Sequence, residues 1–194
     1  MNLSLSGPYS QTICDAVGYA VSAGALVVAA AGNNGWSTPT YPAACPGAIG
    51  VAATDSNDNV PPWSNFGNPN VFVAAPGVSI LTTARGGGYT TVDGTSLAAP
   101  YASALAALLF SQDPLRTAPV VKTILAETAD KAGTAGYGDD PYSTCGTCTW
   151  NPTYGYGRID LANALEYAGP TFSVSASGAT PASVAPGGSA TYTI

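Results

Sequence analysis

Residues 25–33 read ALVVAAAGN, and this run indicates the fold class. It is an unbroken run of small and β-branched residues, which is typical of a strand covered on both faces in a parallel sheet. Residues 48–54 (AIGVAAT) and 71–77 (VFVAAPG) repeat that character. We therefore predict three buried strands of a mostly parallel sheet.

Helical patterns alternate with these runs. In residues 12–23 the apolar side chains recur at spacings of three and four and a glycine follows as a stop, which predicts an amphipathic helix. Residues 96–110 are apolar on every side, so we expect a helix buried all round, with Pro100 in its first turn. Two further helices are predicted at 118–129 and 160–168. Helices between strands predict an α/β fold, with helices flanking the sheet.

The composition changes after residue 169. Residues 170–194 alternate apolar and polar side chains and contain a Pro-Gly-Gly turn, a pattern that favours strands. Such a short segment does not fold alone. We predict one α/β domain at 1–169 and, at 170–194, the start of an appended β-sandwich-like domain or a linker.

The charge pattern argues against two classes of partner. The 194 residues include only five Lys and Arg and carry a net charge of −6, so no basic patch is expected for nucleic acid or an anionic membrane. The apolar runs are shorter than the roughly 20 residues that a membrane span needs. Residues 1–10 show no signal-peptide pattern.

The four cysteines suggest an oxidising compartment. We predict a local disulfide between Cys145 and Cys148 and a second bridge between Cys14 and Cys45. Free thiols remain an alternative. Half of a zinc or redox motif is another, but the chain has no histidine and no second such motif to complete a zinc site.

Two polar residues stand at the edges of this apolar core. Asn33 ends the first buried run, and Ser96 begins the apolar helix. Unpaired backbone N–H groups and the helix dipole at a helix start favour an oxyanion, and an asparagine NH₂ aimed at the same point would add a donor. The alternative is that Ser96 only caps the helix and Asn33 only turns the chain.

A nucleophilic serine needs a base, and the usual one is absent because the chain contains no histidine. Lys122 and Lys131 are the only lysines, and both lie well beyond the predicted serine helix. This placement argues against a Ser-Lys dyad.

Six motifs occur in the order found in one protease family. They are NLSLSGP, AAAGNNG, YPAACPGAIGVAAT, APGVSI, GTSLAAP and YGYGRIDLANAL. Over residues 2–168 the chain resembles the C-terminal half to two-thirds of the catalytic domain of subtilisin-like serine proteases (subtilases). The sedolisins share Gly-Thr-Ser but usually have an aspartate in place of Asn33, so they match less well.

The resemblance implies a set of site residues. Ser96 would be the nucleophile, and the Asn33 side chain with the Ser96 backbone N–H would form the oxyanion hole. An extended peptide would pair as an added strand, and small residues would leave room for a large apolar side chain before the scissile bond. The strand partners would be Ser4, Leu5 and Ser6, and the pocket residues Ala30, Ala31 and Gly32.

The resemblance also implies that the chain is part of a longer parent protein, a secreted and monomeric serine endopeptidase. Its substrates would be peptides or proteins, and its chemistry needs no cofactor. A structural calcium is possible in the parent, with the loop 43–48 as a candidate place, but we assign no metal ligand.

Three departures from the family pattern matter. The aspartate and histidine motifs of the triad precede the residues matched here, so we expect this chain alone to be inactive and truncated at both ends. Tyr101 stands where the family usually has a histidine that is not catalytic, and Ser6 replaces a customary glycine. The alternative function is a non-catalytic peptide-binding or structural relative.

Overall fold

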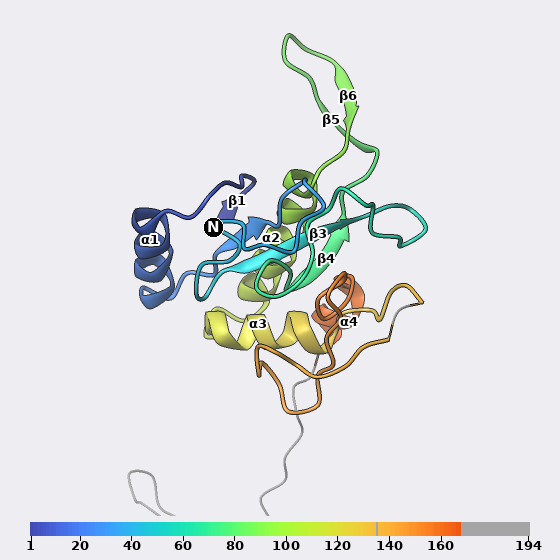
Figure 1. Cartoon of the computed structure of the whole chain (residues 1–194). Coiled ribbons are helices and arrows are strands. Elements are labelled where there is room, and N and C mark those ends of the chain that lie inside the picture. Colours follow the sequence, from blue (N-terminus) through green and yellow to red (C-terminus); the bar gives the residue numbers. More distant parts are fainter. Residues whose placement is uncertain (135, 168–194) are drawn as a thin grey trace, which may run out of the picture.

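The computed structural model describes residues 1–134 and 136–167. A parallel sheet with strand order β1-β2-β3-β4 lies at its centre (Figure 1). The three predicted buried strands are present, each shorter than its apolar run, and an additional short strand, β1, pairs with β2. The strands are β1 (Asn2–Leu3), β2 (Val28–Ala30), β3 (Ile49–Thr54) and β4 (Val73–Pro76).

Both faces of β2 and of Val27, the residue just before it, are covered, as the sequence predicted. Val27 packs with Val17 of a helix on one side, and Val28 packs with the residues of a second helix on the other. Successive side chains of an extended segment point to opposite faces, so neighbouring valines serve two separate apolar clusters. This explains why the run is apolar without alternation.

Four helices occur at or near the predicted positions. The first helix is capped by Ser10, whose side chain accepts from the N–H of Ile13, and it ends before Gly24, which has a φ of +88°. Asp160 caps the last helix in the same way. The helices are α1 (Gln11–Ser22), α2 (Thr95–Gln112), α3 (Ala118–Glu127) and α4 (Leu161–Glu166).

The expectation that the serine helix is buried all round is wrong. In α2, the side that packs on the sheet is buried, whereas Tyr101 is 45% and Leu108 is 46% exposed. The strands β2, β3 and β4 and the helices α3 and α4 all contact α2. The apolar composition of α2 therefore did not predict that its whole surface is buried.

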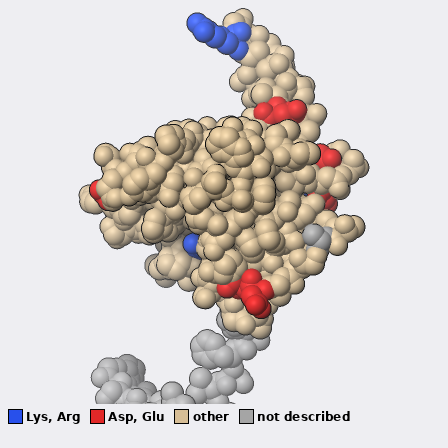
Figure 2. All heavy atoms as spheres, viewed as in Figure 1, with Lys and Arg blue, Asp and Glu red and all other residues tan. Residues whose placement is uncertain are grey.

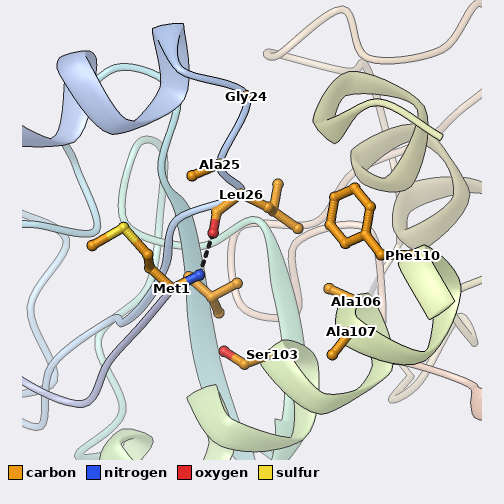
Figure 3. A pocket seen from close by; sticks show the side chains of 9 residues that line it. Met1, Gly24, Ala25, Leu26, Ser103, Ala106, Ala107 and Phe110 are labelled. Carbon is orange, nitrogen blue, oxygen red and sulfur yellow. Dashed lines mark hydrogen bonds between the residues drawn. The ribbon is translucent and has the colours of Figure 1, made fainter. Parts of the chain in front are cut away.

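An open hollow of about 370 Å³ lies beside α2. Figure 3 shows Phe110, Ala106, Ala107 and Ser103 of α2 on one side, and Met1 with residues 24–26 on the other. The N-terminal amine of Met1 donates to the carbonyl oxygen of Leu26 at 2.6 Å. The lining is mostly apolar, and it adjoins the edge strand β1.

Sequence reasoning missed an antiparallel hairpin made by β5 (Ile80–Thr83) and β6 (Tyr89–Val92). It projects from the body of the molecule (Figure 1), and all four residues of β6 are exposed. Gly86, Gly87 and Gly88 at its turn all have positive φ values. That run of glycines between β-branched segments was the available signal for a hairpin.

The charges of this face are sparse, as the composition indicates (Figure 2). Most of the visible surface is uncharged; blue atoms stand at the end of the segment that Figure 1 labels β5 and β6 and at one place on the body, and a few red groups are scattered over this face. Within the described residues, no helix is both long enough and apolar enough to cross a membrane. The predicted β-rich segment at 170–194 lies outside the described residues.

Both predicted disulfides are confirmed, and the free-thiol alternative is wrong. Cys14 bonds Cys45, and Cys145 bonds Cys148, with Cα–Cα distances of 5.2 and 5.4 Å. Glu127 lies close to the sulfur atoms of the second pair. Sulfur atoms joined in a disulfide offer no thiolate to a metal.

The two disulfides should differ in their contribution to stability. The bridge Cys14–Cys45 closes a loop with a sequence separation of 31, against 3 for Cys145–Cys148. Loop entropy predicts a loss of about 3–4 kcal/mol when the first bridge is removed and about 2 kcal/mol for the second. Urea unfolding of the paired Cys→Ala variants measures both losses, and an equal or reversed order would contradict this prediction.

Candidate active site

Ser96 is the second residue of α2 and is half-buried. The residue before the helix, Gly94, has a φ of +155°, a conformation that side chains rarely adopt. The N–H of Ser96 is among the first four of the helix, which have no acceptor within the helix. Ser96 therefore stands where backbone donors and the positive end of the helix dipole meet.

The structure brings Asn33 to the start of α2. The Oδ1 atom of Asn33 accepts hydrogen bonds from the backbone N–H of Thr95 at 2.9 Å and from its Oγ1 at 2.8 Å. A Cβ placed on Gly94 would lie 3.4 Å from Nδ2 of Asn33. Because Oδ1 is held by Thr95, the NH₂ group of this exposed residue is left as the donor at the helix start.

Thr95 is a site residue that sequence reasoning missed. Its side chain is fully buried, and its Oγ1 also accepts from the N–H of Gly32 at 3.1 Å. Thr95 thus joins the segment after β2 to the start of α2, directly before Ser96. The available signal was the threonine directly before Ser96 in the GTSLAAP motif.

Ser4 also contacts the Ser96 backbone. Its Oγ donates to the carbonyl oxygen of Ser96 at 2.7 Å. In a regular helix that carbonyl accepts from the N–H four residues later, but here that residue is Pro100, which has none. The expectation that Pro100 lies in the first turn is wrong, because it lies in the second turn and frees the carbonyl that Ser4 binds.

The predicted substrate strand is only partly a strand in this structure. β1 ends at Leu3, and Ser4, Leu5 and Ser6 follow it as exposed residues. Gly7 then forms an antiparallel bridge with Tyr41. The three residues are thus anchored at both ends and exposed between them.

The predicted pocket residues are all buried. Ala30 and Ala31 pack their side chains into two different apolar clusters. Gly32 has a φ of +107°, and a Cβ there would lie 2.3 Å from Nδ2 of Asn65. Only glycine fits at this position, where the chain leaves β2.

Neither lysine is engaged with Ser96. The Nζ atom of Lys122 lies 4.7 Å from the ring centre of Phe72, and that of Lys131 donates to the carbonyl oxygens of Thr149 and Tyr156. Burial lowers the pKa of both lysines, and the charge of Asp140 partly opposes this shift. These contacts agree with the sequence argument against a Ser-Lys dyad.

A model of the Subtilase family matches residues 1–157. The chain belongs to the subtilase family. This subtilase is 43% identical over 169 residues to Thermitase of Thermoactinomyces vulgaris, covering 86% of this chain and 54% of Thermitase. It is 40% identical over 169 residues to the Thermophilic serine proteinase of Bacillus sp. (strain AK1), covering 86% of this chain and 37% of that protein.

Subtilisin DY of Bacillus licheniformis is 41% identical over 142 residues, covering 71% of this chain and 52% of that protein. The subtilase chain therefore spans about half the length, or less, of these relatives. The family match and the parallel sheet confirm the predicted family and α/β class.

Proposed function

We propose that this subtilase is the serine-bearing part of an endopeptidase that cleaves peptide bonds through an acyl-enzyme on Ser96. The observation that carries the proposal is the junction at the start of α2, where Asn33 bonds Thr95 beside Ser96. An amide donor and a helix N-terminus at one point suit the oxyanion of acyl transfer.

The proposed reaction has two steps. The Oγ atom of Ser96 attacks the scissile carbonyl carbon while a base takes its proton, and the oxyanion is bound by the NH₂ of Asn33 and the N–H of Ser96. The base returns the proton to the leaving amine as the C–N bond breaks. In the second step the base takes a proton from water, and the water oxygen attacks the acyl carbon. The base then returns the proton to Oγ of Ser96 as the ester bond breaks, which releases the acid.

We propose that the base lies outside residues 1–194. The chain has no histidine, and in subtilisins the aspartate and histidine precede the serine in the chain. The chain covers 37% and 54% of the length of two relatives, which supports a longer functional unit. So do the edge position of β1 and the apolar hollow beside α2. Alone, the chain should be inactive.

We propose a peptide or protein substrate bound as an added strand. The exposed segment of Ser4, Leu5 and Ser6 would pair with the substrate backbone, and the residues around Gly32 would border the pocket for the preceding side chain. This chemistry uses protein groups alone and needs no cofactor. A structural calcium in the parent stays a proposal without assigned ligands.

We also propose a secreted, monomeric parent that binds neither nucleic acid nor membrane. The two disulfides support an oxidising compartment. The net charge of −6 argues against binding to phosphate backbones or anionic lipids.

The test supplies the missing base. The N-terminal part of Thermitase that precedes its matched segment is fused to this chain, and we call this fusion the completed protease. We expect the completed protease to hydrolyse casein and to be labelled by a fluorophosphonate on Ser96, because the label requires an activated serine. The chain alone should do neither.

Two outcomes would contradict the proposal. Cleavage by the chain alone would show that it contains its own base. A folded fusion that binds peptides but neither cleaves nor takes the label would favour the non-catalytic, peptide-binding relative.

A further inference from the structure

Asn65 is fully buried and uses its whole side-chain amide. Its Nδ2 donates to the carbonyl oxygen of Ala31 and to Oγ1 of Thr40, both at 2.9 Å. Its Oδ1 accepts from the N–H groups of Asn34 and Trp36, both at 3.0 Å. Both hydrogens and both acceptor positions of the amide are therefore satisfied.

These partners lie on both sides of Asn33. Ala31 precedes it, Asn34 and Trp36 follow it, and the backbone N–H of Asn65 donates to the carbonyl oxygen of Gly32 at 2.9 Å. Asn65 has no hydrogen bond with the Asn33 side chain, whose oxygen is held by Thr95. The segment 31–36 is thus held by two separate sets of hydrogen bonds, one made by Asn65 and one by Thr95.

The segment needs such a support. Gly32 and Gly35 both have positive φ values, and glycine gives the backbone more freedom than any other residue. Asn33, Asn34 and Trp36 are exposed, so few packing contacts fix them. Oxyanion donors act only when they are held close to their productive position before the reaction.

We propose that Asn65 is a positioning residue for the oxyanion hole. It holds the backbone on both sides of Asn33, so that the NH₂ group of Asn33 meets the developing negative charge. This role rests on the proposed peptidase function. Asn65 acts on the transition state through Asn33, so it contributes little to substrate binding.

The chain offers a matched control in Asn70. Asn70 is also fully buried, its Oδ1 accepts from the N–H of Thr40 at 2.8 Å, and its Nδ2 donates to the carbonyl oxygens of Thr38 and Phe66. It has the same residue type and burial as Asn65, but all of its partners lie outside the segment 31–36. A purely structural role should therefore give the two residues the same effect.

The experiment compares Asn65→Ala with Asn70→Ala in the completed protease. Both substitutions should lower the free energy of unfolding, because each removes buried hydrogen bonds. Only Asn65→Ala should lower kcat, by about 10- to 100-fold with KM within about twofold, since a displaced donor loses part of its effect. In an Asn33→Ala background, Asn65→Ala should lower kcat by no more than about twofold further.

Hydrogen exchange of the completed protease gives a readout that does not depend on catalysis. The amides of Asn34 and Trp36 should exchange faster in Asn65→Ala and unchanged in Asn70→Ala. If Asn65→Ala does not fold, Asn65→Asp keeps both acceptor positions and removes the NH₂ that donates to Ala31 and Thr40. Asn65→Asp should lower kcat less than Asn65→Ala does. In the Asn33→Ala background it should lower kcat no further.

Three results would overturn the proposal. They are equal losses of kcat in Asn65→Ala and Asn70→Ala, an undiminished effect of the Asn65 substitution when Asn33 is already alanine, and unchanged exchange at Asn34 and Trp36. An inactive but folded completed protease would overturn the proposed function instead, and the exchange result would still decide whether Asn65 holds the segment.

Discussion

Ser96→Ala in the completed protease should lower kcat by about 10⁶-fold, because the substitution removes the atom that forms the acyl-enzyme. That magnitude is the one known for loss of the nucleophile in subtilisin, so it is taken from a relative. The measurement is hydrolysis of a chromogenic peptide. Residual activity should come only from binding and the remaining oxyanion donors.

Ser103→Ala is the matched control for this substitution. Ser103 lies on the same helix and its Oγ donates to Oδ1 of Asn2 at 3.0 Å, away from the helix start. We expect it to keep normal kcat and fluorophosphonate labelling. Activity that survives Ser96→Ala but not Ser103→Ala would show that the nucleophile has been wrongly assigned.

Asn33→Ala in the completed protease should lower kcat by about 10²- to 10³-fold and leave KM nearly unchanged, because its NH₂ acts on the transition-state oxyanion. The range is the one known for the equivalent donor of a subtilisin. Steady-state kinetics on one peptide substrate separates kcat from KM.

The bonds of Asn33 to Thr95 allow a sharper version of this test. Asn33→Asp keeps an oxygen that accepts from Thr95 but replaces the NH₂ donor by a second oxygen. It should lose at least as much activity as Asn33→Ala, because a carboxylate repels the oxyanion. A raised KM with normal kcat in either variant would place Asn33 in substrate binding instead.

Sequence patterns were sufficient for the three buried strands β2, β3 and β4, because strands covered on both faces are built almost entirely from apolar residues. The run before Asn33 is apolar on both faces, and the structure indeed packs Val27 and Val28 into different clusters. The same reasoning failed for α2, whose exposed side is also apolar. Composition reports the residues of a helix, whereas burial depends on which elements lie against it.

The sequence by itself determined the α/β class, the family and the order of the main strands and helices, and it predicted the pair Asn33 and Ser96 as site residues. These follow from local periodicity and motif order, which need no knowledge of distant contacts. Only the tertiary structure decided what holds that pair. The bonds of Thr95 and Asn65 around Asn33, and of Ser4 to the carbonyl that Pro100 leaves free, join residues far apart in the chain. A hydrogen bond depends on a distance of about 3 Å and on direction, and these are fixed only when the strands and α2 pack together.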